Sequence, residues 1–154
     1  MGSEMCIRDR ISAEELGTLV GSKELNVFVQ IASDGKITIY SATPEMGQGV
    51  KTALPMIIAE EMGAKWADVE VIDAPLDADK YGFQGAGGST SIPRNFDTMR
   101  KMGASAREML IGAASETMEV DRGELEARDS IVVHSSGEFD FRTTRCACGQ
   151  AAVA

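Results

Sequence analysis

The sequence has few basic residues and no cluster of them: 15 Lys and Arg stand against 24 Asp and Glu in 154 residues, which gives a formal net charge of −9. Affinity for nucleic acid comes mainly from clustered Lys and Arg, so the composition argues against a protein that binds a phosphate backbone. The sequence contains no run of about 18 apolar residues, so it predicts no membrane-spanning helix. The sequence also contains no basic stretch followed by an apolar stretch, which is the pattern of a signal peptide. A hydrophobic content of 44% is instead typical of one globular domain.

Residues that bind metals through sulfur or imidazole are scarce as well. Cys146 and Cys148 form a Cys-x-Cys pair, and His134, the single histidine, precedes it. A zinc site usually needs two ligand pairs, so this set lacks a fourth ligand and predicts no metal site. Cys6 is set aside because residues 1–10 (MGSEMCIRDR) resemble a translated sequencing adapter, and we interpret them as a scar of it.

Alternating apolar residues predict a β-hairpin. NVFVQIA at 26–32 alternates, and KITIYS at 36–41 alternates again after a Ser-Asp-Gly turn. VEVID at 69–73 and IVVH at 131–134 predict two further short strands. Residues 74–95 are predicted to be a long connection, which in a compact domain is typical of a binding segment or of disorder.

A first amphipathic helix is predicted from Val50 to Met62, ahead of Gly63, a natural C-cap residue. Pro55 lies within this segment. Either the regular helix begins near Thr52, so that Pro55 falls in its first turn, or the helix is kinked at Pro55.

A second amphipathic helix is predicted to begin at an Asp97 N-cap and to close near Thr117. Its Met99, Met102 and Met109 share one face, a pattern that favours adaptable core packing over a cofactor box. The order β-β-α-β-loop-α-β predicts an α+β fold in which a hairpin and short strands pack on two amphipathic helices around an incomplete core.

Two glycine-rich loops precede the predicted helices: Gly47-Gln48-Gly49 and QGAGGSTS at 84–91. Glycine lets backbone N–H groups approach a bulky anion, Ser and Thr hydroxyls can donate to phosphate oxygens, and a helix N-terminus carries partial positive charge. Neither loop matches GxxxxGK[ST] or the dinucleotide fingerprint GxGxxG. From spacing alone, the loops are either simple turns or a site for an anionic cofactor.

Four motifs follow one another along the chain: EMGQG at 45–49, TALPM at 52–56, AEE at 59–61 and QGAGGSTS at 84–91. This series resembles the molybdopterin-binding large subunits of the xanthine dehydrogenase and aldehyde oxidase superfamily, and the resemblance runs from about residue 26 to about residue 134. The resemblance is strongest to the beta subunits of the isoquinoline 1-oxidoreductase branch.

The resemblance implies a partial molybdenum-cofactor-binding domain. In that family, the glutamine that corresponds to Gln48 hydrogen-bonds an oxygen ligand of the molybdenum, and the glycines beside it let the backbone approach the pterin. The second loop lines the same cofactor from another side. The expected cofactor-binding residues are those of the two loops: Gly47, Gln48, Gly49, Gly87, Gly88, Ser89, Thr90 and Ser91. The family's catalytic glutamate lies in a GxGE-like segment late in a much longer subunit, so we expect no catalytic residue here.

The resemblance also implies a reaction, a cofactor and partners. The reaction is hydroxylation of an N-heterocycle or aldehyde with water as the oxygen source. The cofactor is molybdopterin with molybdenum, in its cytosine dinucleotide form, and the partners are a small [2Fe-2S] subunit and an electron acceptor. We expect the isolated chain to bind the cofactor weakly or not at all, because the family site is assembled from distant segments. The compartment, periplasmic or cytoplasmic, stays open.

By these patterns the chain divides into an adapter-derived scar at 1–10, a poorly defined lead-in at 11–25, the partial domain at 26–141 and a tail at 142–154. The tail departs from the family pattern, and we attribute it to a frameshift that resequencing of the locus would test. Two other functions stay open: a non-catalytic α+β interaction module whose glycine-rich loops are structural turns, and a nucleotide-phosphate binder of separate ancestry.

Overall fold

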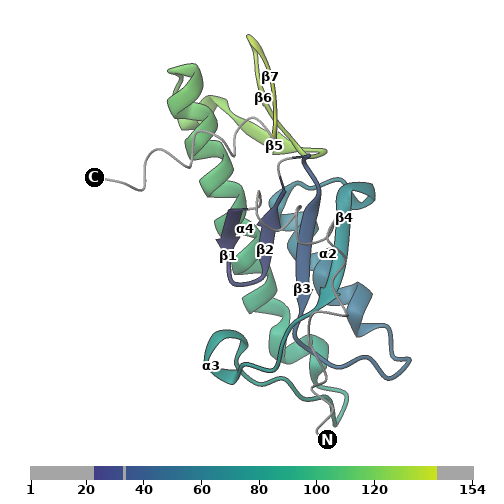
Figure 1. Cartoon of the computed structure of the whole chain (residues 1–154). Coiled ribbons are helices and arrows are strands. Elements are labelled where there is room, and N and C mark those ends of the chain that lie inside the picture. Colours follow the sequence, from purple (N-terminus) through teal and green to yellow (C-terminus); the bar gives the residue numbers. More distant parts are fainter. Residues whose placement is uncertain (1–22, 33, 142–154) are drawn as a thin grey trace, which may run out of the picture.

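A computed structural model describes residues 23–32 and 34–141 of the chain. A four-stranded sheet stands in front of two helices, and a small three-stranded sheet lies across one end (Figure 1). The predicted α+β class is confirmed. The large sheet has its strands in sequence order: β1 (Lys23–Asn26), β2 (Val29–Ile31), β3 (Ile37–Ser41) and β4 (Val69–Asp73).

The segment 26–32, predicted as one strand, is a turn followed by a strand. β1 and β2 pair antiparallel across a two-residue turn, with Asn26 opposite Val29, and β1 begins within the segment expected to be a lead-in. The Asn26 side chain holds this turn in place. Its Oδ1 accepts from the N–H of Phe28 at 3.0 Å, and its Nδ2 donates to the carbonyl of Met102 at 2.9 Å.

The predicted hairpin of β2 and β3 is confirmed, with Val29 opposite Ile39 and Ile31 opposite Ile37. All four of these side chains are fully buried. β3 and β4 run parallel, so the chain must cross over between them, and a helix makes that crossing. The predicted bounds of β4 are confirmed.

The crossing helix is α2 (Val50–Met62). It begins before Thr52, so Pro55 lies inside it and not in its first turn. Because proline has no N–H, one carbonyl of the preceding turn has no intrahelical partner. Gly63 ends α2 in the left-handed conformation at φ 74°, which confirms the predicted C-cap.

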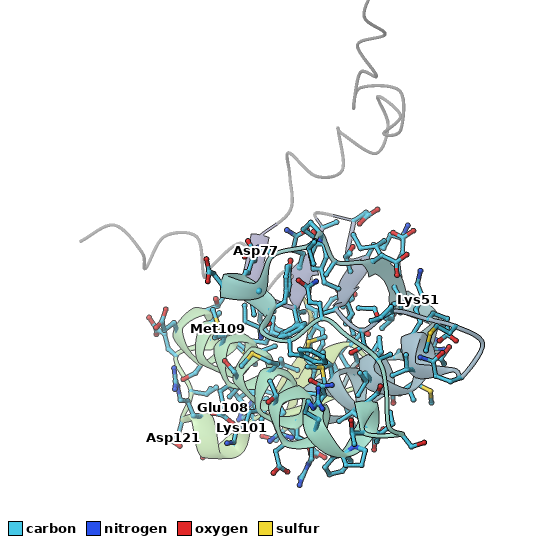
Figure 2. All side chains as sticks on the ribbon, turned by 90° about the horizontal axis from the view of Figure 1, so that it is seen from below. Lys51, Asp77, Lys101, Glu108, Met109 and Asp121 are labelled. Carbon is cyan, nitrogen blue, oxygen red and sulfur yellow. The ribbon has the colours of Figure 1, made fainter. Side chains whose placement is uncertain are left out.

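The second long helix, α4 (Ser91–Met118), begins well before the predicted Asp97 N-cap. Pro93 falls in its first turn, where a missing N–H breaks no helical bond, so the Ser- and Pro-containing segment that was predicted to be a loop is helical. Its predicted close near Thr117 is confirmed. Met99 is buried as predicted, but Met109 is 38% exposed and lies on the outer side of the helix (Figure 2).

Within the predicted long connection the chain also forms a short helix, α3 (Ala78–Tyr81). The Asp77 carboxylate caps it by accepting from the N–H of Lys80 at 3.0 Å. Tyr81 is buried against the ring of Phe28, at 5.5 Å between centroids. This contact fixes the connection to the β1–β2 turn.

Helices α2 and α4 together cover one face of the large sheet (Figure 1). They lie close together at Gly103, where an added Cβ would lie 2.5 Å from the carbonyl oxygen of Ile58. An ion pair between Glu61 and Arg100 lies beside this contact. Glycine at this position therefore sets the separation of the two helices.

The small sheet contains β5 (Glu126–Arg128), β6 (Ile131–His134) and β7 (Gly137–Asp140), of which only β6 was predicted. A 3-10 turn, η3 (Arg122–Glu124), precedes it. Ser130 fastens this sheet to the end of α2: its N–H donates to the carbonyl of Gly63, and its hydroxyl accepts from the N–H of Lys65, each at 2.9 Å.

Candidate functional site

The two predicted loops lie at the same end of the molecule (Figure 1). Residues 42–49 connect β3 to α2, and residues 82–90 connect α3 to α4, so each loop leads into a helix N-terminus. The carboxyl ends of the parallel strands β3 and β4 lie at this end too, the place where α/β sheets commonly bind ligands. The structure thus brings the eight expected cofactor-binding residues to one end.

The first loop is closed around the carboxylate of Glu45. Its Oε1 accepts from the N–H of Gly47 at 2.6 Å and of Gly49 at 3.0 Å, and its Oε2 accepts from the N–H of Lys51 at 3.0 Å. The N–H groups of Lys51 and then Gly49 are the largest causes that hold the pKa of the Glu45 carboxyl below its ordinary value. The anion at the start of α2 is therefore one of the chain's own side chains.

Gln48 is folded back onto the same loop. Its Nε2 donates to the carbonyl of Pro44 at 2.8 Å, and its Oε1 accepts from the N–H of Met46 at 2.5 Å. Gly47 and Gly49 have φ values of 92° and 78°, which L side chains rarely adopt. In the described part of the chain, nothing beyond the immediate neighbours lies within 4 Å of a Cβ added at either glycine, so backbone conformation and not crowding requires glycine there.

The second loop is exposed and has a different construction. Gly88 and Ser89 are both left-handed, with φ 62° and 57°, and the Thr90 hydroxyl donates to the carbonyl of Gly87 at 3.0 Å. Arg94 donates from Nη2 to the Thr90 hydroxyl at 3.2 Å. The first turn of α4, which the structure describes in full, contains no acidic residue and receives no side-chain cap. The N-terminus of α4 is therefore open, which means that it has no side-chain cap, whereas the N-terminus of α2 is closed by the Glu45 carboxylate.

A hollow of about 450 Å³ lies at the ends of β3 and β4, beside Glu45 of the first loop and Gln84 at the start of the second. The eight expected cofactor-binding residues do not line it. Lys51 and Asp73 form an ion pair on its wall at 2.7 Å, and Figure 2 shows Lys51 at the edge of this end of the molecule. Ser41 also lines it, and within the described residues its buried hydroxyl has no hydrogen-bond partner. Sequence reasoning missed these residues. The available signal was that Ser41 and Asp73 are the last residues of two neighbouring strands.

His134 has a structural role in the small sheet. Its Nδ1 is 2.6 Å from the Ser136 hydroxyl, and its Nε2 is 3.2 Å from a Glu124 carboxylate oxygen. Cys146 and Cys148 lie outside the described residues. Across residues 23–32 and 34–141, no group of three His, Cys, Asp or Glu side chains could hold a metal ion. Within those same ranges, no helix is long and apolar enough to cross a membrane.

Three comparisons relate the chain to known proteins. The model of the molybdopterin cofactor-binding domain family matches residues 5–152. Isoquinoline 1-oxidoreductase subunit beta of Brevundimonas diminuta is 36% identical over 115 residues, which is 71% of this chain and 15% of that protein. A membrane-bound aldehyde dehydrogenase of Gluconacetobacter polyoxogenes, named for pyrroloquinoline quinone, is 32% identical over 79% of this chain and 16% of its own length.

Solved structures show the same fold. Quinoline 2-oxidoreductase from Pseudomonas putida 86 superimposes with a TM-score of 0.66 at 24% identity, over 80% of this chain and 16% of that one. CO dehydrogenase from Oligotropha carboxidovorans gives 0.62 at 23% identity, over 75% and 15%. The chain thus spans about one sixth of the length of these relatives. The predicted resemblance is confirmed, and the chain belongs to the family of molybdopterin cofactor-binding domains.

Proposed function

We propose that this chain is the part of a molybdenum hydroxylase large subunit that holds the molybdopterin between the loops 45–49 and 87–91. The observation that carries the proposal is that two glycine-rich loops, each at a helix N-terminus, lie at one end of a domain whose family binds this cofactor. Spacing alone left these loops as turns or as an anion site. Family membership favours the second interpretation.

The residues present fit such a group, and the two loops fit different parts of it. At the second loop, the uncapped N-terminus of α4 and the nearby Arg94 guanidinium supply donors and positive charge for an anionic moiety. The Thr90 hydroxyl would have to exchange its bond to the Gly87 carbonyl for one to the ligand. At the first loop, the open space above Gly47 and Gly49 lets a flat ring approach the backbone. We propose that Gln48 reaches the cofactor by exchanging its bonds to Pro44 and Met46 for bonds to the ligand.

The finer features follow from the resemblance and belong to the same proposal. They are a cytosine dinucleotide form of the cofactor, a small [2Fe-2S] subunit that passes electrons to an acceptor, and a substrate that is an N-heterocycle or an aldehyde. The names of relatives include isoquinoline, nicotinate and aldehyde, which is consistent with both substrate classes. The bound cofactor would supply the hydroxylation chemistry, and this chain would bind and orient it.

One observation favours the alternative of an interaction module with structural turns. In the first loop, the Glu45 carboxylate accepts from the N–H groups of Gly47 and Gly49, and the Gln48 side-chain amide donates to the carbonyl of Pro44. A turn without a ligand would be bonded in the same way. The second loop shares this feature at Thr90, whose hydroxyl donates to the carbonyl of Gly87, but the N-terminus of α4 has no side-chain cap. The alternative therefore predicts that side chains added in the second loop have no effect on cofactor content.

The test is to recover the uninterrupted gene, produce the subunit with its neighbouring iron–sulfur subunit, and measure molybdenum and pterin in the purified complex. Gly87→Val is the informative variant, because a Cβ there meets no described atom within 4 Å beyond its immediate neighbours. Gly137→Val in β7 is the matched control, with equally open space at the opposite end of the molecule. We expect Gly87→Val to lower the molybdenum and pterin content of the complex, and we expect Gly137→Val to leave both unchanged. A wild-type complex that contains pyrroloquinoline quinone and no molybdenum would overturn the proposal.

A further inference from the structure

We propose that Glu45 is a positioning residue: its carboxylate is the internal anion of the first loop, which fixes the backbone around Gln48 and keeps external phosphate away from the N-terminus of α2. The inference deepens the proposed function and rests on it only in assigning this loop to the cofactor site. The contacts of Glu45 themselves are independent of that assignment.

Both carboxylate oxygens of Glu45 are used. Oε1 receives two N–H groups, from Gly47 and Gly49, and Oε2 receives the N–H of Lys51. The acceptors therefore hold residues on both sides of Gln48, so that the position of Gln48 depends on Glu45. A glutamine at residue 45 could not keep all three bonds, since its NH₂ group is a donor and would face another donor.

Glu45 also replaces the cap that α2 lacks. The residue at the N-cap position is Gly49, which has no side chain, and the first turn, described in full, contains no acidic residue. The carboxylate reaches this turn from four residues before the cap and supplies the negative charge that a helix N-terminus favours. A phosphate at the same place would meet a like charge and would have to displace three hydrogen bonds.

The two helix N-termini are consequently unequal. The open start of α4 offers uncapped N–H groups, whereas the start of α2 offers N–H groups that Glu45 already holds. The first loop is left with glycine backbone and open space, which suit the uncharged face of a ligand. Because of Glu45, the first loop favours the uncharged face of an anionic cofactor, and the start of α4 favours its charged part.

The experiment follows the backbone amides of Gly47, Gly49 and Lys51 by NMR in the full chain, while inorganic phosphate is added. In the wild type we expect no saturable phosphate-dependent shift of these three signals. In Glu45→Gln we expect their hydrogen exchange to accelerate and phosphate to shift them saturably. Glu60→Gln is the matched control. It removes one negative charge from an exposed position on α2, away from the first loop, and should behave as the wild type does.

Glu45→Asp separates charge from geometry, because it keeps the charge on a shorter side chain and should still exclude phosphate. If the variants fold poorly, a pH titration of the wild type suffices. The three amides should titrate together, with an apparent pKa below the ordinary value of 4.5, and the ion pair of Lys51 with Asp73 is the neighbouring charged group to follow alongside. Saturable phosphate shifts in the wild type, or amides that do not respond to Glu45→Gln, would overturn the inference. Neither result depends on whether the parent subunit contains molybdenum.

Discussion

The crossing of α2 and α4 is set by the absence of a side chain at Gly103, and Gly103→Ala tests this directly. The added methyl would lie 2.5 Å from the carbonyl oxygen of Ile58 and 2.8 Å from the Cβ of Glu61, well inside the ordinary contact distance of about 3.5 Å. One of these neighbours is backbone and cannot rotate away. Overpacking costs about 1–3 kcal/mol, and a backbone atom at 2.5 Å places this case in the upper half of that range, about 2–3 kcal/mol. The gain in helix propensity from Gly to Ala returns about 1 kcal/mol. We therefore expect a net loss of about 1–2 kcal/mol.

Gly112→Ala in the same helix is the matched control. Its methyl would meet the guanidinium of Arg122, the far end of an exposed and flexible side chain that can move. The propensity gain should then dominate, and stability should stay level or rise by up to about 1 kcal/mol. Thermal unfolding followed by circular dichroism measures both variants, and we expect a Tm lower by roughly 5 °C for Gly103→Ala. Equal stability of the two variants would refute the close-contact explanation.

Four further substitutions should have distinct results. Ile58→Ala, at a fully buried site, should cost about 2–5 kcal/mol in urea unfolding, whereas Met109→Ala on the exposed side of α4 should change stability by no more than about 0.5 kcal/mol. Ser41→Ala should raise the free energy of unfolding by about 1 kcal/mol, because it removes a buried hydroxyl without a partner in the described residues; a loss would show that the hydroxyl has one. Glu45 has a lowered pKa in the folded state, so its stabilisation is present above the ordinary value of 4.5 and is lost as pH falls. The stability difference between wild type and Glu45→Gln should therefore shrink in acid, and a difference that stays constant down to the acid limit would contradict this.

The parts of the fold with a clean local period could be predicted from the sequence. The bounds of β4 and the C-cap at Gly63 follow from alternation and from a glycine at the end of a helical pattern. The β2–β3 hairpin follows from two alternating runs on either side of a turn. In each case, the signal lies within a few residues of the feature that it predicts, so that no distant contact is needed.

The parts that depend on distant contacts could not be predicted. The β1–β2 turn is held by Asn26, whose second bond reaches Met102 on α4, and no local pattern marks that contact. Met109 was predicted to share the face of Met99, but at 3.6 residues per turn it lies about 80° further round the helix, and its side chain is 38% exposed. The start of α4 was missed because Ser, Pro and Thr were interpreted as loop residues, although Pro93 fits the first turn of a helix.

For the candidate site, the sequence located the two loops but not the difference between them. Their glycines and hydroxyl residues look alike as motifs, and both precede helices. What separates the loops is a single carboxylate: Glu45 turns back onto the start of α2, while nothing acidic lies in the first turn of α4. That difference arises from a backbone that curls through two left-handed glycines, so it becomes visible only when the chain is folded.

The same difference bears on the prediction that this chain alone binds the cofactor weakly or not at all. Ligand binding gains free energy where it satisfies donors that are otherwise exposed, and the first loop has already satisfied its own through Glu45 and Gln48. The second loop alone then offers open donors, with Arg94 as the nearby cation. A pterin seated across both loops would be held firmly only on the side of α4. Under the proposed function, the remaining contacts would come from protein outside this chain, and relatives about six times its length are consistent with that proposal.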